Sequence, residues 1–245
     1  MHTIALVTGA NRGIGLGGGE TLARSGHTVV MTGRNLEALT LASITLKDDG
    51  LDVDVLVLDV NSTASIRCAV QQVCLRHGRL DILVNSAGIL PEARSGATPT
   101  FADPNDFAVT FQTNLFGAVA VIEAFLPLLH QSLGGRIVNI SSTMGSLADQ
   151  ENPASPYYGA AVPAYRASKA ALNSVTIELS KQLAGSNIKV TSVCPGFVQT
   201  DLTPVSREQA PLTAAQAATV VLAAATLPAG AASGTFVDAA GTVAW

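Results

Sequence analysis

The sequence has few cysteines, few aromatic residues and little charge: three cysteines, 4% aromatic and 13% charged residues in a chain of 245. The cysteines lack the spacing of a disulfide framework or a zinc site, and the four histidines fit no zinc site either. We therefore expect no metal and interpret Cys68, Cys74 and Cys194 as core residues. The 14 basic residues form no cluster and the net charge is -4, which argues against nucleic acid as a partner.

Long hydrophobic runs are also missing. The longest apolar helix candidate, 217–227, stops at Pro228 and falls short of the roughly 20 residues that a membrane span needs. The first residues carry no basic segment ahead of their apolar run, unlike a signal peptide. We expect a soluble, cytoplasmic protein with a small-molecule partner and no membrane partner.

The sequence does contain a regular alternation of short β-branched runs and longer amphipathic stretches, which predicts βα units around a parallel sheet. The runs are rich in Val, Ile and Leu, which indicates burial on both faces. Seven strands are expected, at 3–8, 28–32, 53–59, 80–85, 135–141, 188–193 and 234–239. Helices are expected at 14–25, 35–48, 63–77, 104–132, 164–184 and 213–226. Apart from the Pro- and Gly-bearing segment 149–164 no linker is visible, so we predict one α/β domain over 1–245, a doubly wound parallel sheet with helices on both faces.

A glycine-rich stretch, TGANRGIGLGGGETLARSG, follows the first predicted strand. Two registers of a dinucleotide-binding fingerprint compete, Gly13-Gly15-Gly18 and Gly9-Gly13-Gly15. Because the strand ends at Thr8, the turn must begin at Gly9, which favours the second register. Its glycines would let the backbone and a helix N-terminus approach a pyrophosphate. The glycines at 17–19 each cost about 1 kcal/mol relative to alanine in a helix, and we expect them to permit close packing on the sheet.

The end of the second predicted strand bears on which nucleotide is bound. An NAD site usually offers a carboxylate to the ribose 2′-hydroxyl here, whereas a 2′-phosphate needs a basic partner. The sequence VVMTGRN has no carboxylate at this place and carries Arg34, which can bind phosphate through two charge-assisted bonds. Arg12, in the glycine turn, would supply a second positive charge. These residues predict NADP(H) as the cofactor.

The stretch YRASK places Tyr165 and Lys169 four residues apart on a predicted helix, so both side chains project from one face. A free tyrosine has a pKa of about 10, and a nearby ammonium group favours the phenolate. We therefore expect Lys169 to lower the pKa of Tyr165 and give it an acid/base role. Taken alone, the pair would be better explained as a tyrosine on a helix surface with an unrelated lysine nearby.

Seven motifs together make the chain resemble the short-chain dehydrogenase/reductase family. They occur in that family's order over essentially the whole chain: TGANRGIG, LDV, NSAG, TNLFG, IVNISS, YRASK and CPGFVQTD. The resemblance implies a Rossmann-type sheet and an Asn-Ser-Tyr-Lys tetrad, carried here by Asn114, Ser142, Tyr165 and Lys169. Ser141 is the alternative serine, and its place in IVNISS favours the second of the two.

The resemblance also implies what each residue does. Tyr165 would donate a proton to the carbonyl oxygen during reduction, Ser142 would polarise that oxygen, Lys169 would bind ribose hydroxyls, and Asn114 would hold a water that links Lys169 to solvent. Asp59 would contact adenine, Val60 would offer its main chain, and Thr200 would hold the nicotinamide amide. The full set of implied cofactor contacts is Gly9, Asn11, Arg12, Gly13, Ile14, Gly15, Arg34, Asp59, Val60, Asn85, Ala87, Gly88, Tyr165, Lys169, Pro195, Gly196, Val198 and Thr200.

The chain departs from the family pattern in the length of the interval between Ser142 and Tyr165. Tyr165 follows Ser142 by 23 residues, about ten more than is usual in the family, and such long loops often carry specificity. We expect the extra segment, 149–162, to lie at the mouth of the site. We expect the protein to form a dimer or a tetramer. It would be a monomer if this segment blocks the surface that relatives use for assembly.

The ending SGTFVDAAGTVAW resembles NADPH-dependent carbonyl reductases of this family, and we predict that activity, with reversible oxidation of secondary alcohols. The candidate pocket residues are mostly apolar and indicate a hydrophobic substrate: Leu90, Met144, Leu147, Tyr157, Tyr158, Phe197 and Leu202. Reduction of a 3-oxoacyl thioester is an alternative. A non-catalytic NADP(H)-sensing protein is another, although it would predict a damaged tetrad. A serine hydrolase is not indicated, because G-x-S-x-G is absent and His2, His27, His77 and His130 lie outside every motif.

Overall fold

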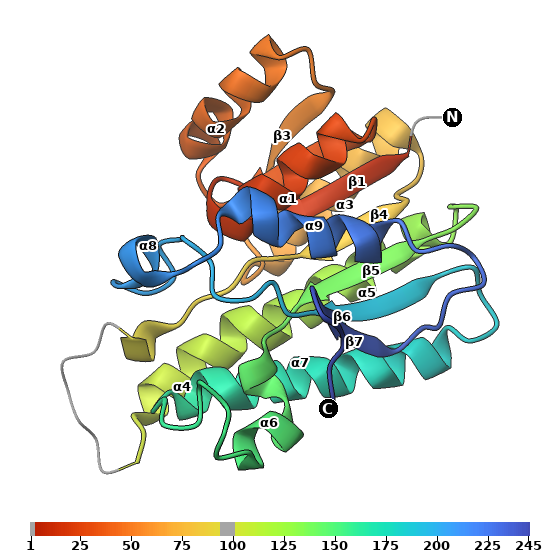
Figure 1. The fold of residues 1–245 in the computed structure, drawn as a ribbon. Helices are drawn as coiled ribbons and strands as arrows, with labels where there is room; N and C mark the ends of the chain where they lie inside the picture. The colour runs from red at the N-terminus through yellow and green to blue at the C-terminus, as the bar shows by residue number, and fades with distance from the viewer. Residues whose placement is uncertain (1–2, 94–100) are drawn as a thin grey trace.

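The computed structural model describes residues 3–93 and 101–245. Within them, one sheet has the strand order β3-β2-β1-β4-β5-β6-β7-β8, parallel except for the antiparallel pair β7 and β8 (Figure 1). Its strands are β1 Ile4–Thr8, β2 Thr28–Gly33, β3 Val53–Val57, β4 Ile82–Asn85, β5 Arg136–Ile140, β6 Lys189–Val193, β7 Thr235–Asp238 and β8 Gly241–Thr242. The predicted doubly wound sheet and its seven strands are confirmed. The two-residue β8 was not predicted, because so short a strand carries no periodic pattern.

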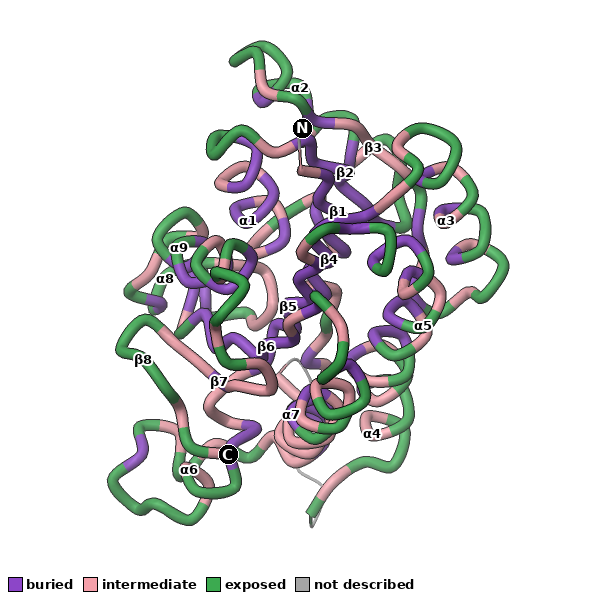
Figure 2. Tube along the Cα trace, turned by 90° about the vertical axis from the view of Figure 1, so that its right-hand side faces the viewer, coloured by how far each residue is buried: buried purple, intermediate pink, exposed green. Residues whose placement is uncertain are grey.

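Helices cover both faces of the sheet: α1, α2 and α9 lie on one side and α3, α5 and α7 on the other (Figure 2). The α-helices are α1 Gly13–Arg24, α2 Leu36–Asp48, α3 Thr63–His77, α4 Pro104–Phe111, α5 Ala118–Leu129, α6 Leu147–Glu151, α7 Pro163–Gln182, α8 Ser206–Gln209 and α9 Ala214–Ala225. Short 3-10 turns form at η1 Pro91–Ala93 and η3 Thr143–Gly145. The small elements α6, α8, η1 and η3 were not predicted.

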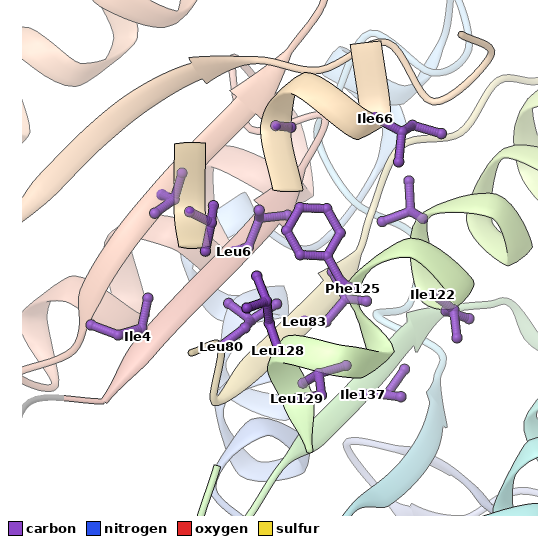
Figure 3. Close-up of a cluster of buried hydrophobic side chains, with 14 of the residues drawn as sticks. Ile4, Leu6, Ile66, Leu80, Leu83, Ile122, Phe125, Leu128, Leu129 and Ile137 are labelled. Atoms are coloured by element: carbon purple, nitrogen blue, oxygen red, sulfur yellow. The ribbon is translucent and has the colours of Figure 1, made fainter. Parts of the chain in front are cut away.

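Alternate residues of β1 enter two separate cores. Leu6 packs with Phe125 of α5 in one core, and Val7 packs with α1 and α9 in the other. Figure 3 shows the first core, in which the Phe125 ring lies among aliphatic side chains from the strands and from α3 and α5. Both faces of the strand are therefore buried, as its unbroken apolar sequence predicted.

The predicted helix 104–132 is interrupted. A π-helical turn, η2 Gln112–Gly117, joins α4 to α5, and the joined segment Pro104–Leu129 is long and apolar enough to cross a membrane by length and composition alone. The expectation that 217–227 is the longest apolar helix is therefore wrong. The inward face of α5 packs Val121, Ile122 and Phe125 against the sheet, which accounts for its apolar sequence.

Close packing around α1 explains its glycines, with one correction. A Cβ on Gly17 would lie 2.8 Å from the main-chain oxygen of Ala214 in α9, whereas one on Gly19 would make only an ordinary 3.7 Å contact with Val29 of the sheet. A Cβ on Gly18 would also point toward α9, 3.6 Å from Val221 Cγ1. The predicted packing on the sheet therefore holds only for Gly19, and Gly17 is required by a helix almost 200 residues away in the chain.

The interpretation of all three cysteines as core residues is wrong for two of them. Cys68 and Cys74 are exposed on α3, and Cys194 is buried after β6. The core-facing residues of α3 are Ile66, Ala69 and Val73, so its cysteines fall on the outer face. Within residues 3–93 and 101–245, no group of three or more His, Cys, Asp or Glu side chains is placed to hold a metal ion.

Candidate active site

A cavity of about 620 Å³ opens at the carboxyl ends of the parallel strands. In a doubly wound sheet this edge is where ligands bind, because the loops that follow the strands diverge there. All predicted cofactor-binding and catalytic residues except Asn85 and Asn114 line the cavity. The site therefore joins segments that lie far apart in the sequence, from the glycine turn after β1 to the loop after β6.

The glycine turn has the geometry that the second register predicted. Gly9 and Gly13 have φ angles of +66° and +56°, and a Cβ on Gly15 would lie 2.3 Å from the carbonyl oxygen of Gly9. Helix α1 begins at Gly13, so its first N–H groups lie at the cavity. Gly18, which the first register required, lies deeper in α1. The turn is a cradle that any side chain would fill, which fits the pyrophosphate of a dinucleotide.

Arg34 follows β2 and lines the cavity, as the sequence predicted for a residue that meets a 2′-phosphate. Arg12 is more constrained, since its Nη1 lies 3.4 Å from Asp201 Oδ2. Asp201 also pairs with Arg207 of α8, and the pKa of its carboxyl is lowered chiefly by that hydrogen bond. The positive charge of Arg12 is thus partly neutralised, and Arg34 is the better candidate for a phosphate partner.

Ser142, Tyr165 and Lys169 meet on one side of the cavity. Tyr165 and Lys169 lie one turn apart in α7, with Lys169 Nζ 5.5 Å from the centre of the Tyr165 ring. The Tyr165 hydroxyl is hydrogen-bonded to Ser142, which supports Ser142 over Ser141. Lys169 Nζ donates a 2.7 Å hydrogen bond to the main-chain oxygen of Ile140 at the end of β5.

Asn114, the fourth residue of the predicted tetrad, lies in the π-helical turn and forms hydrogen bonds to residues next to the cavity. Its side chain accepts a hydrogen bond from the main-chain N–H of Ile89 (2.8 Å) and donates to the Ile89 oxygen (2.9 Å) and to Ser168 Oγ (3.2 Å). A Cβ on Gly88 would lie 3.5 Å from Asn114 Oδ1 and 3.8 Å from Lys169 Nζ. Asn114 and Lys169 therefore both approach Gly88, and Asn114 does not line the cavity. Asn85, which also does not line it, is buried and donates to Asn139.

Burial shifts the pKa values of both Tyr165 and Lys169. It raises the pKa of Tyr165 well above its ordinary value, against the opposing effect of the Ser142 hydrogen bond. It lowers the pKa of Lys169 to about 8. The prediction that Lys169 lowers the Tyr165 pKa is thus wrong for this structure, because burial has the largest effect on that pKa and Lys169 is not among the groups that shift it. At neutral pH Tyr165 is a protonated phenol beside a mostly charged Lys169, and it can donate a proton.

The second half of the segment 149–162, which the sequence predicted at the mouth of the site, contributes to the wall of the cavity. Tyr157 and Val162 line the cavity, and Arg166 of α7 donates a hydrogen bond to the main-chain oxygen of Tyr157. The apolar wall includes five of the predicted pocket residues: Leu90, Met144, Tyr157, Phe197 and Leu202. The prediction is wrong for Leu147 and Tyr158, which are exposed and do not line it.

Two parts of the site were not predicted from the sequence. Thr203, Pro204, Val205 and Ser206 add a wall next to α8. Glu92 of η1 accepts hydrogen bonds from the first turn of α7. Since Glu92 lies more than 70 residues before its partners, no local pattern could have revealed it.

Comparison with known proteins shows similarity over most of the chain. A family model described as short chain dehydrogenase matches residues 3–211. A 3-oxoacyl-(acyl-carrier-protein) reductase of Thermotoga maritima is 34% identical over 213 residues, which cover 86% of this chain and 80% of that protein. The structure of an NADPH-bound carbonyl reductase from chicken fatty liver is 28% identical with a TM-score of 0.86, and that of the carbonyl reductase Sniffer of D. melanogaster is 29% identical with a TM-score of 0.84. Both structural comparisons cover 100% of each chain.

Proposed function

Because this chain belongs to the short-chain dehydrogenase family, we propose that it transfers hydride reversibly between NADPH and the carbonyl carbon of a small hydrophobic ketone or aldehyde. One observation carries the proposal. A protonated tyrosine, hydrogen-bonded to a serine and one helical turn from a buried lysine, lines the same cavity as a glycine turn suited to a dinucleotide. Proton delivery and nucleotide binding are thereby brought to one place.

The cofactor preference rests on Arg34. The end of β2 carries this guanidinium and no carboxylate, and the glycine turn offers backbone N–H groups for the pyrophosphate. When bound, NADPH supplies the hydride. The chicken carbonyl reductase, similar over its full length, was solved with NADPH, which supports the same choice here.

The chain's own residues handle the proton and the developing charge. As a carbonyl is reduced, negative charge gathers on its oxygen and must be met by a proton and hydrogen bonds. Tyr165 would donate the proton and Ser142 would hydrogen-bond the same oxygen, while Lys169 would bind the ribose hydroxyls of the cofactor. Asn114 fixes the Ile89 backbone and Ser168 beside that lysine.

The substrate class follows from the apolar wall of the cavity. Leu90, Met144, Phe197 and Leu202 line the same cavity as Tyr165 and favour a hydrophobic carbonyl compound. The similarity to the Thermotoga reductase favours a second candidate, a 3-oxoacyl thioester. A non-catalytic NADP(H)-binding protein is less well supported, since all four tetrad residues are present.

A panel of hydrophobic ketones, aldehydes and 3-oxoacyl thioesters, each assayed with NADPH and with NADH, separates these candidates. We expect the highest kcat/KM with a hydrophobic ketone or aldehyde and NADPH. A thioester turned over far faster than every simple ketone would establish the second candidate instead. Stoichiometric NADPH binding without turnover of any member would leave the sensing protein.

The pKa of Lys169 predicts a pH dependence. The ammonium is charged below its pKa of about 8 and loses its proton as the pH rises through that value, so kcat/KM for carbonyl reduction should fall there. The pKa of Tyr165 lies higher, so the phenol keeps its proton over this range. A Lys169→Arg variant that still turns over should retain its activity to higher pH, because a guanidinium stays charged. An unchanged alkaline limb in that variant would assign the limb to another group.

A further inference from the structure

The first turn of α7 is capped by a side chain from another part of the chain. The N-cap residue is Val162, and Pro163 at the next position has no N–H to satisfy. The N–H groups of Ala164 and Tyr165 donate to the two carboxylate oxygens of Glu92, each at 2.9 Å. Arg166 N–H already donates to the oxygen of Val162 at 3.0 Å. Glu92 therefore accepts both hydrogen bonds that this helix start would otherwise lack.

One of those two residues is Tyr165 itself. Two hydrogen bonds to one planar carboxylate restrain the first turn in position and in rotation about its axis, and the negative charge is favourable at a helix N-terminus. The main chain of Tyr165 is thus held by Glu92 while its phenol is hydrogen-bonded to Ser142. We propose that Glu92 is a positioning residue, which sets the place from which Tyr165 delivers its proton. This inference rests on the proposed function.

The other end of the same short segment is held by the tetrad too. The Asn114 side chain makes two hydrogen bonds to the main chain of Ile89, three residues before Glu92. Leu90, which lies between Ile89 and Glu92, and Ala93, which follows Glu92, line the cavity. The segment 89–93 is therefore a wall of the substrate pocket that is hydrogen-bonded to Asn114 at one end and to the backbone of Tyr165 at the other.

A cap that only stabilises the helix and one that positions the tyrosine have different consequences. Loss of an ordinary cap lowers the stability of the fold and leaves the folded enzyme as active as before. A displacement of the acid by about 1 Å can cost on the order of 100-fold in rate, with the cofactor still bound. The two roles are separated by the effect on kcat at constant affinity for NADPH.

The experiment compares Glu92→Gln, Glu92→Ala and the control Glu178→Gln in the full chain. Glu178 is an exposed carboxylate near the other end of α7, paired with Lys181. We expect Glu92→Gln, in which an amide NH₂ faces one of the N–H groups, to lower kcat about tenfold and Glu92→Ala to lower it further. The Kd for NADPH should stay within about twofold of the wild type, and the solvent deuterium isotope effect on kcat should rise as proton delivery slows. Glu178→Gln should leave all three quantities unchanged.

The outcomes are distinguishable. A wild-type kcat and isotope effect in Glu92→Gln would overturn the positioning role, as would a lowered kcat that is explained by a smaller folded fraction in thermal unfolding. If Glu92→Ala fails to fold, the near-isosteric Gln variant decides. A wild-type protein that reduces no carbonyl compound would instead overturn the proposed function, and with it this inference.

Discussion

Tyr165→Phe should abolish carbonyl reduction while NADPH binding persists. The substitution removes only the phenolic oxygen, which is hydrogen-bonded to Ser142, and leaves the buried ring to pack as before. General acid catalysis contributes about 10²- to 10⁴-fold, and kcat should fall by that range. The measurement is kcat with a hydrophobic ketone, together with the Kd for NADPH from fluorescence titration.

The matched control for this change is Tyr158→Phe. Tyr158 is exposed, follows the cavity-lining Tyr157 directly, and does not line the cavity. Its loss of a hydroxyl should leave both kcat and the Kd for NADPH unchanged. If Tyr165→Phe kept most of its activity, another group would have to deliver the proton.

Arg34→Asp should reverse the preference between the two nicotinamide cofactors. The guanidinium makes charge-assisted bonds to a 2′-phosphate, and hydrogen bonds to charged groups contribute about 1.5–3 kcal/mol, or roughly 10- to 100-fold in affinity. An aspartate would repel that phosphate and accept a hydrogen bond from the 2′-hydroxyl of NADH. The Kd for NADPH should therefore rise by at least about tenfold, while the Kd for NADH falls or stays level.

Lys47→Asp serves as the control for Arg34→Asp, because it makes the same change of charge at the opposite end of α2. It should alter neither Kd. Equal weakening of NADPH and NADH binding by Arg34→Asp would mean that Arg34 supports the site without selecting the phosphate.

The sequence predicted best what depends on neighbours along the chain. Tyr165 and Lys169 are four residues apart in a helix, so their shared face follows from helical geometry alone. The glycine turn was located correctly because the first strand ends at Thr8 and leaves Gly9 as the start of the turn. In both places the local pattern is sufficient.

Features set by tertiary contacts were not predicted, or were predicted wrongly. The requirement for Gly17 comes from α9, and the cap on α7 comes from Glu92, neither of which is near in sequence. The π-helical turn around Asn114 accompanies hydrogen bonds to Ile89 and Ser168 that no periodicity encodes. The pKa of Tyr165 was predicted in the wrong direction because residue spacing reports the distance to Lys169 but not the depth of burial.

Transfer of a labelled hydride would show whether this protein reduces a carbonyl compound with NADPH. NADPH carrying deuterium at C4 of the nicotinamide on the transferred face would be incubated with the enzyme and its best ketone, and the alcohol would be analysed by mass spectrometry. We expect one deuterium on the carbinol carbon, and loss of this product in Tyr165→Phe. Hydride transfer would be contradicted if the alcohol were unlabelled with both cofactors, the one labelled on one face of C4 and the one labelled on the other. The absence of any alcohol with every carbonyl substrate would contradict it as well.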